Sequence, residues 1–493
     1  MCAEFDHWDE QKHNAELHFG AASVLSLALT MTTDDNEVGM VCTALEMVFR
    51  ASTASVHIAF DKVGTSLIPW MLQIMQKCEN GKLKNSDACM LNITKTLVYF
   101  SRVPELRYQL ARHPKLAQAL IRVSTSILSG DCRITRMRLI TNLVNCEDNK
   151  VFFLELDGML ESILRIAALD LLDKPREYAS LALMDLAACP SNHEAMARNE
   201  KLLAALVKLA VIEKTPEARE GAVSALQNLA FCQANRQRLV SFRTGVVLEA
   251  LKKVISTDTD AKARRRASGA LTNLACDDTS ETMANHPGLL ETLAVVSNKD
   301  DSVEVQARAS MALTKIATNI SCHMPAYKTL LDALVVASLS TSTNSVSAVL
   351  RVKARDPENR ESMAKHPGVL DTLADICVSD CVPVKECDNA MRAIMHLTNE
   401  EANHKVMCQK TILEALVTGI NTEGKEWVDV QESAVVALER LATDHDNRPV
   451  MARHNGLLTA VAKATEREDR GDTNGSTREK LAKPLLMSLL LAM

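Results

Sequence analysis

The chain has 493 residues, of which 47% are hydrophobic and only 3% aromatic, and its formal net charge is −6. Helix-forming residues dominate the apolar share over those that favour strands, so we expect an all-α protein. Negative charge and few aromatic side chains argue against nucleic-acid binding, and no apolar run approaches the roughly 18 residues of a membrane span. The 14 cysteines include no CxxC pair. Free thiols at this density are typical of a reducing compartment, so we expect a cytoplasmic or nuclear protein.

One short phrase recurs along the chain and sets a repeat. After N-terminal capping helices over 1–37, we expect a first long helix over 38–51. The fourth residue of the recurring phrase is Leu143, Leu186, Leu229, Leu274, Ile316, Leu397 and Leu441, with gaps of 43, 43, 45, 42, 81 and 44. The gap of 81 covers two units, one of them a degenerate copy near Val352. A period slightly above 40 predicts a helical solenoid, here of about ten repeats.

Each repeat is predicted to contain three helices. The segments MANHPGLLETL from Met283 and MAKHPGVLDTL from Met363 mark a short helix, an HPG turn and the start of a second helix. Proline disfavours helical geometry at the preceding histidine, and the glycine tolerates unusual backbone angles. The third and longest helix then follows, as over 303–318. Histidines recur at these turns, which indicates a structural role: His113, His286, His366 and His454.

The predicted solenoid covers 1–466. A polar linker over 467–477 and a C-terminal amphipathic helix over 478–493 follow it. The phrases at Leu226–Ala230 and Leu271–Ala275 resemble the N-L-A signature of armadillo repeats. The resemblance covers about residues 38–466. It implies a right-handed α-α superhelix whose third helices line a concave face.

The resemblance also implies a binding ladder on that face. In armadillo proteins the asparagine of the signature clamps the backbone of an extended peptide, and the matching residues here are Asn142, Asn228 and Asn273. The other repeats depart from the pattern, with Asp185, Lys315, His396 and Arg440. The tryptophans that accompany the ladder in nuclear-import members are absent, since Arg138, Ser224 and Gly269 stand there. This departure argues against recognition of nuclear-import signals.

Residues four and seven before each ladder position share its helix face. That face is predominantly basic, and the residues expected to bind a partner are Arg138, Asn142, Asn228, Arg266, Asn273, Arg308, Lys315, Arg392, His396 and Arg440. A stripe of basic side chains attracts acidic segments, and arginine suits bidentate contacts with carboxylates. We therefore expect protein partners that present acidic, extended segments.

No catalytic or nucleotide-binding motif is found, so we expect a non-enzymatic scaffold without cofactor or metal. The cysteines at 377, 381 and 387 lack zinc-site spacing, and Cys322 and His323 form a pair without further ligands nearby. Ser268 in RRRAS is a candidate for phosphorylation. Two alternative functions stay open: a nuclear-transport cargo receptor, and a substrate-binding or regulatory subunit of a ubiquitin ligase or small-GTPase regulator complex.

Overall fold

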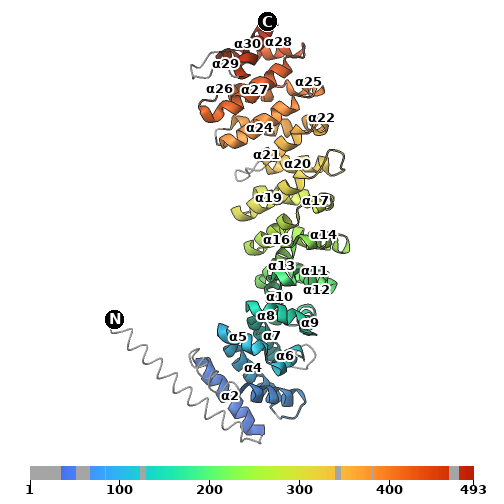
Figure 1. Ribbon diagram of the computed structural model, residues 1–493, viewed down its shortest axis with the longest axis vertical. Coiled ribbons are helices and arrows are strands. Elements are labelled where there is room, and N and C mark those ends of the chain that lie inside the picture. The colour runs from blue at the N-terminus through green and yellow to red at the C-terminus, as the bar shows by residue number, and fades with distance from the viewer. Residues whose placement is uncertain are drawn as a thin grey trace, which may run out of the picture. The chain divides into compact units, whose positions relative to one another are not determined.

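The computed structural model describes residues 35–51, 67–83, 85–122, 129–338, 346–379, 381–465 and 477–493, and these ranges contain helices but no strand. The chain divides into two compact units, Met1–Leu239 and Val240–Met493. Each unit is a stack of three-helix repeats, as the sequence period predicts (Figure 1).

The third helices of the repeats form the spine of each unit. In the first unit they are α2 (Asp35–Ala51), α4 (Ser86–Arg102), α7 (Gly130–Val144), α10 (Asp173–Ala187) and α13 (Pro216–Phe231). In the second unit they are α16 (Ala261–Leu274), α19 (Val303–Thr318), α21 (Val346–Arg355), α24 (Val384–Leu397) and α27 (Val428–Leu441). Within each unit every third helix packs on the next one in this order. The described residues thus contain the ten third helices that the repeat spacing predicts.

The remaining helices complete the repeats. The first helices are α5 (Pro104–Ala111), α8 (Glu147–Glu155), α11 (His193–Arg198), α14 (Gln233–Ser241), α17 (Asp277–Ala284), α22 (Pro357–Lys365), α25 (His404–Met407) and α28 (Asn447–Arg453). The second helices are a helix over 67–79, α6 (Pro114–Ile121), α9 (Met159–Leu169), α12 (Glu200–Ile212), α15 (Val246–Thr257), α18 (Leu289–Lys299), α20 (Tyr327–Ala337), α23 (Val369–Val378), α26 (Lys410–Asn421) and α29 (Leu457–Thr465). Short 3-10 turns are η2 (Pro190–Asn192), η3 (Phe242–Thr244), η4 (Glu401–Asn403) and η5 (Lys425–Trp427).

Small and branched apolar residues explain how the helices pack. In α13, Ala222, Leu226 and Leu229 are at most 1% exposed. Their spacing of three and four residues places them on one face of the helix. Alanine lets neighbouring helices approach closely, and each buried leucine contributes about 1.5–3 kcal/mol. Because one helix face alone cannot bury this surface, stability depends on stacking between repeats.

The HPG turns have the predicted geometry. Gly288 and Gly368 have φ angles of 71° and 87°, in the left-handed region that glycine tolerates. His366, which precedes a proline, ends α22 in an extended conformation. The first helix therefore stops at the histidine, and the glycine begins the second helix.

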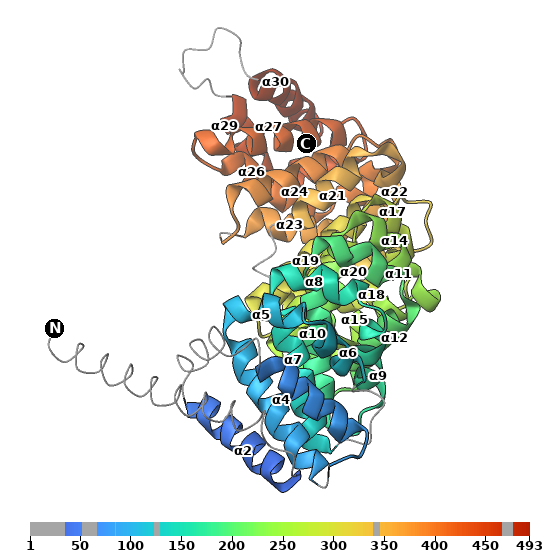
Figure 2. The ribbon, with the colours of Figure 1, turned by 60° about the horizontal axis from the view of Figure 1, so that its bottom comes forward.

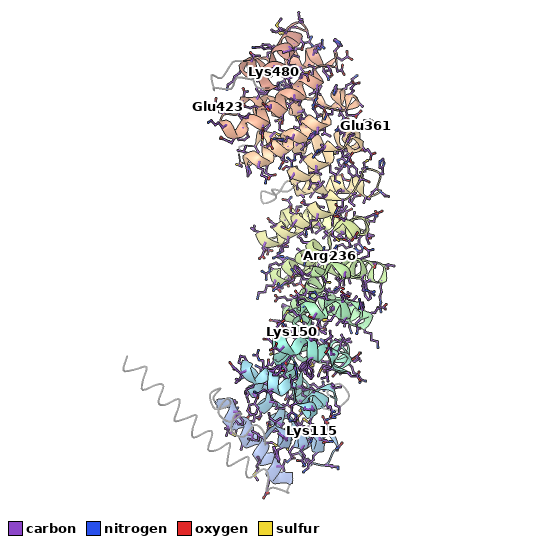
Figure 3. The ribbon with its side chains drawn as sticks, viewed as in Figure 1. Lys115, Lys150, Arg236, Glu361, Glu423 and Lys480 are labelled. Carbon is purple, nitrogen blue, oxygen red and sulfur yellow. The ribbon has the colours of Figure 1, made fainter. Side chains whose placement is uncertain are left out.

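A buried asparagine ties five of the repeats to the repeat before, a feature that was not predicted from the sequence. Asn192 donates from Nδ2 to Leu186 O, near the C-terminal end of α10, at 3.0 Å. It also donates to Lys150 O in the preceding repeat at 3.1 Å. The amide of each asparagine donates to the carbonyl six residues earlier, which belongs to the signature leucine or, for Asn359, to Lys353. These residues are Asn149, Asn192, Asn235, Asn359, Asn403 and Asn447. Figure 3 labels Lys150 and Arg236, which follow two of these staple asparagines.

The degenerate repeat is a real but shortened unit. Its third helix, α21, holds Lys353 six residues before Asn359, where the other repeats hold leucine or isoleucine. Lys353 is only 6% exposed, and its Nζ donates to Thr318 O at 3.0 Å and to Ile320 O. A buried lysine thus joins α21 to the end of α19, in place of an apolar contact.

Only parts of the two ends of the predicted chain organisation lie within the described residues. The capping helices over 1–37 lie outside the described residues, apart from 35–37 at the start of α2, and so does the linker up to residue 476. Helix α30 (Thr477–Leu490) packs on α27, α28 and α29, with Ala482, Leu485 and Leu489 buried. No helix in the described ranges is both long and apolar enough to span a membrane.

Candidate functional site

The ladder residues of the first unit lie half-buried on the third helices α7 and α13. Asn142 donates from Nδ2 to Ser101 Oγ at 2.9 Å, so part of its amide holds α7 against α4. Asn228 has no hydrogen-bond partner among the residues that the structure describes. Arg138 lies one turn before Asn142 and is also half-buried. The first unit therefore offers one unpaired ladder amide and one arginine on this face.

In the second unit, several predicted basic residues are already bound to neighbouring groups. Arg308 forms an ion pair with Glu304 at 3.3 Å, and Lys315 donates to Thr272 O at 3.2 Å. Arg266 and Asn273 are half-buried on α16, and both take part in interactions within the protein. These four residues do lie on α16 and α19 as expected, but each already takes part in an interaction within the protein.

Arg392 is the most strongly neutralised of the predicted residues. Its guanidinium contacts Asp388 at 2.8 Å on the same helix and Asp429 at 2.9 Å on α27. These two carboxylates raise the pKa of Arg392. An acidic partner would have to compete with both aspartates, so Arg392 is a poor anchor for such a partner.

An uncompensated group of basic side chains surrounds His396 on α24. We call it the arginine cluster, and its members are Arg351 and Arg355 on α21, Arg360 on α22, His396, and Arg440 on α27. Helix α24 packs on both α21 and α27 (Figure 2), and these two helices carry three of the arginines. No carboxylate lies within 4.0 Å of the four guanidinium groups in the described part of the chain.

Hydrogen bonds to backbone carbonyls hold two of the arginines in place. Arg440 donates from a terminal nitrogen to Met395 O at 2.9 Å, next to His396. Arg360 donates to Ala354 O at 3.2 Å and to Arg355 O at 3.0 Å, at the end of α21. Cations are favoured at this end of a helix because its carbonyls carry partial negative charge. Both guanidinium groups therefore keep their position without a carboxylate partner.

The pKa shifts in the cluster reflect burial and positive potential. Burial lowers the pKa of His396, and Arg360, Arg440, Arg355 and Arg351 lower it further. Burial also lowers the pKa of Arg440; Glu439 opposes this shift and Arg360 adds to it. His396 is therefore neutral at pH 7, while the arginines stay charged. Such a surface favours an anionic ligand that accepts several charge-assisted hydrogen bonds.

Only two members of the arginine cluster, His396 and Arg440, were predicted from the sequence. Arg351 and Arg355 are spaced four residues apart and share a helix face, which is a visible signal. They were missed because the degenerate repeat hides the register of α21. Arg360 directly follows Asn359, at the position held by His193, Arg236, His404 and Arg448 in other repeats. Recognition of the staple asparagines would have located it.

Ser268 is fully buried in α16. Its hydroxyl donates to Arg264 O at 2.9 Å, and Arg264 itself contacts Asp300 at 2.8 Å. Arg264, the first arginine of the RRRAS segment, thus has a structural role at the next repeat. Phosphorylation of Ser268 requires that this part of α16 opens.

One expectation about metal-binding residues needs correction. The sequence predicts that Cys322 and His323 form a pair without further ligands nearby, but the fold places Glu358 beside them. The glutamate is 35 residues away along the chain, in the first turn of α22, so sequence spacing could not reveal it.

No protein-family model and no curated protein matches the sequence. Among solved structures, the chain is similar to one from a structure of the interaction between cadherin and beta-catenin, with 18% identity, a TM-score of 0.54, and coverage of 97% of this chain and 96% of that one. It is also similar to an engineered protein, with 18% identity, a TM-score of 0.50, and coverage of 95% and 99%. A designed armadillo repeat protein in complex with the peptide (KR)4 has 21% identity, a TM-score of 0.41, and coverage of 50% and 98%. The period, the three-helix units and the first of these likenesses agree, and the chain has the armadillo-type repeat fold, an all-α solenoid.

Proposed function

We propose that this protein is a non-enzymatic scaffold that binds acidic, extended segments of partner proteins through the arginine cluster. The observation that carries the proposal is the absence of any carboxylate within 4.0 Å of Arg351, Arg355, Arg360 and Arg440 in the described residues. An arginine with a purely structural role usually has a carboxylate beside it that balances its charge, as Arg392 has in Asp388 and Asp429. Four arginines that repel one another weaken the fold slightly, which is tolerated when a ligand supplies the missing negative charge.

Arginine chemistry favours carboxylate groups as the ligand. Each guanidinium presents a planar fork of donors that matches the two oxygens of a carboxylate. Backbone carbonyls already fix Arg360 and Arg440, so less side-chain freedom is lost when a ligand binds. Arg355 is exposed and Arg351 is half-buried, so both can reach a ligand from α21.

Binding of a fluorescein-labelled peptide of alternating glutamate and glycine, measured by fluorescence anisotropy, tests the proposal. The triple variant Arg351→Gln/Arg355→Gln/Arg440→Gln removes three positive charges from the cluster. At about 0.5–1 kcal/mol for each exposed ion pair, we expect the affinity to fall roughly ten- to a hundredfold. The affinity of the unaltered protein should fall as salt is added, because salt screens exposed charges.

A charge-matched variant separates the cluster from net charge. Arg198→Gln/Arg308→Gln/Arg392→Gln also removes three positive charges, but all three arginines already have carboxylate partners. Its peptide affinity should stay within about twofold of the unaltered protein. Equal losses in both triple variants, or unchanged affinity in the cluster variant, would reject the arginine cluster as the binding site. Circular dichroism shows whether each variant remains helical.

A further inference from the structure

The staple asparagine is missing at two junctions of the second unit. The position six residues after Leu274 holds Ser280, and the position six residues after Ile316 holds Cys322, which is followed by His323. In most other repeats the equivalent pair is Asn–His or Asn–Arg, and its second side chain bonds to a carbonyl at the end of the third helix, as His404 does to Thr398 O. His323 has turned away from that position and contacts Glu358 instead.

Three side chains of different chemistry meet at this junction. One ligand atom each from Cys322, His323 and Glu358 lies within 4.8 Å of the other two. His323 Nε2 is 3.0 Å from Glu358 Oε2. Two ligand atoms bound to one tetrahedral zinc ion are separated by about 3.3–3.8 Å, given bonds of about 2.0–2.3 Å. Small rotations of the exposed His323 and Glu358 side chains and of the half-buried Cys322 thus bring all three atoms to bonding distance.

We propose that Cys322, His323 and Glu358 form a binding site for a zinc ion, with a fourth position open to water or to a ligand from a partner. Thiolate, imidazole and carboxylate are the three protein ligand types that zinc accepts, and three ligands with an open position are a recurrent arrangement. Asp356 lies close to Cys322 and adds negative potential, which the nearby Lys353 partly offsets. The proposal is independent of the arginine cluster and of any peptide ligand.

The surrounding structure holds the ligand-bearing segments in register. Lys353 ties the segment at 318–320 to α21, two residues before the cysteine. On the other side, the Asp356 side chain accepts from Glu358 N at 3.2 Å and caps α22, whose first residue is Pro357. The backbone that carries the three ligands is therefore fixed by contacts that do not involve the ligands themselves.

A buried hydroxyl without a hydrogen-bond partner lies near Cys322. Tyr327 is 4% exposed, and its hydroxyl has no hydrogen-bond partner in the described residues. Burial raises the pKa of Tyr327, and the proximity of Cys322 and Asp356 raises it further. A buried hydroxyl without a partner is unfavourable by about 1–3 kcal/mol, and a water or thiolate at a metal ion would accept its proton in a hydrogen bond.

Titration of the chelator-treated full chain with Co²⁺ tests this site, because cobalt bound to a thiolate gives a sulfur-to-metal charge-transfer absorption. We expect one Co²⁺ per chain with this absorption, and its displacement by one equivalent of Zn²⁺. Cys322→Ser should abolish the absorption. Glu358→Gln and His323→Ala should each weaken binding about tenfold or more, since even groups that only support a ligand have effects of this size.

Cys381→Ser is the matched control, because Cys381 is an exposed thiol outside the proposed site. It should bind Co²⁺ like the unaltered chain. Absence of the charge-transfer absorption in the unaltered chain would overturn the proposal, and so would an absorption that persists in Cys322→Ser. Circular dichroism of both serine variants confirms that the helices are retained, so a lost absorption reports on the ligand and not on unfolding.

Discussion

Replacement of Asn192 by alanine removes two buried hydrogen bonds, which the side chain donates to Leu186 O at 3.0 Å and to Lys150 O at 3.1 Å. Asn192 is 1% exposed, so water does not readily replace the lost donor. Each bond contributes about 0.5–1.5 kcal/mol net, and a buried carbonyl without a donor adds a penalty of about 1–3 kcal/mol. We expect the free energy of unfolding to fall by about 2–4 kcal/mol, measured by urea denaturation followed at 222 nm.

Two further variants test whether the donated bonds are the cause. Asn192→Asp has nearly the same shape but presents oxygens to both carbonyls, so it should destabilise at least as much as alanine. Asn228 lies on α13 of the next repeat, and its side-chain amide has no partner among the described residues. Asn228→Ala should therefore change the free energy of unfolding by less than about 0.5 kcal/mol. The reasoning fails if the aspartate variant is as stable as the unaltered protein, or if Asn192→Ala is no worse than Asn228→Ala.

The fully buried Arg136 contacts Glu79 at 2.8 Å, so Glu79→Ala leaves this arginine without a carboxylate partner. The free energy of unfolding, measured by urea denaturation, should fall by about 3–5 kcal/mol. A loss below about 1 kcal/mol would contradict this expectation. Ser268 in the folded chain should incorporate no phosphate from a basic-directed kinase, whereas a peptide of residues 262–270 should; equal labelling by mass spectrometry would show that α16 opens readily. The pKa of His396 is lowered in the folded state, so the unfolded chain binds the proton first and stability falls as pH drops through about 6.5. His396→Gln should reduce the change in the thermal unfolding midpoint between pH 7 and pH 5. An unchanged pH dependence would show that His396 is not its cause.

The helices and turns could be predicted because their signals are local. Apolar residues at helical spacing define the third helices, and Gly288 and Gly368 mark turns that need a positive φ angle. The staple asparagines were equally visible, since Asn149, Asn192 and Asn235 are 43 residues apart. Their role was missed because it depends on carbonyl groups of the preceding repeat, and backbone partners leave no trace in the sequence.

The candidate site was predicted only in part, for a related reason. Helical geometry places Arg392 and Arg440 on similar faces, so the sequence treats them alike. The fold gives Arg392 two aspartates and gives Arg440 a backbone carbonyl, because the partners come from neighbouring helices. Net charge on a helix face is therefore predictable, whereas the part of it that remains free for a ligand depends on packing between repeats.

The degenerate repeat connects these observations. Lys353 replaces the signature leucine, Cys322 replaces a staple asparagine, and the spacing from Ile316 to Lys353 is 37 residues where regular gaps are 42 to 45. Each change weakens the regular contact between repeats, and the same short segment carries Arg351, Arg355, Arg360 and Glu358. Departures from a stabilising pattern are expected where a chain has been selected for binding. The degenerate repeat therefore contributes residues to both proposed sites, and the contacts of Lys353 and the cap at Asp356 maintain the fold beside them.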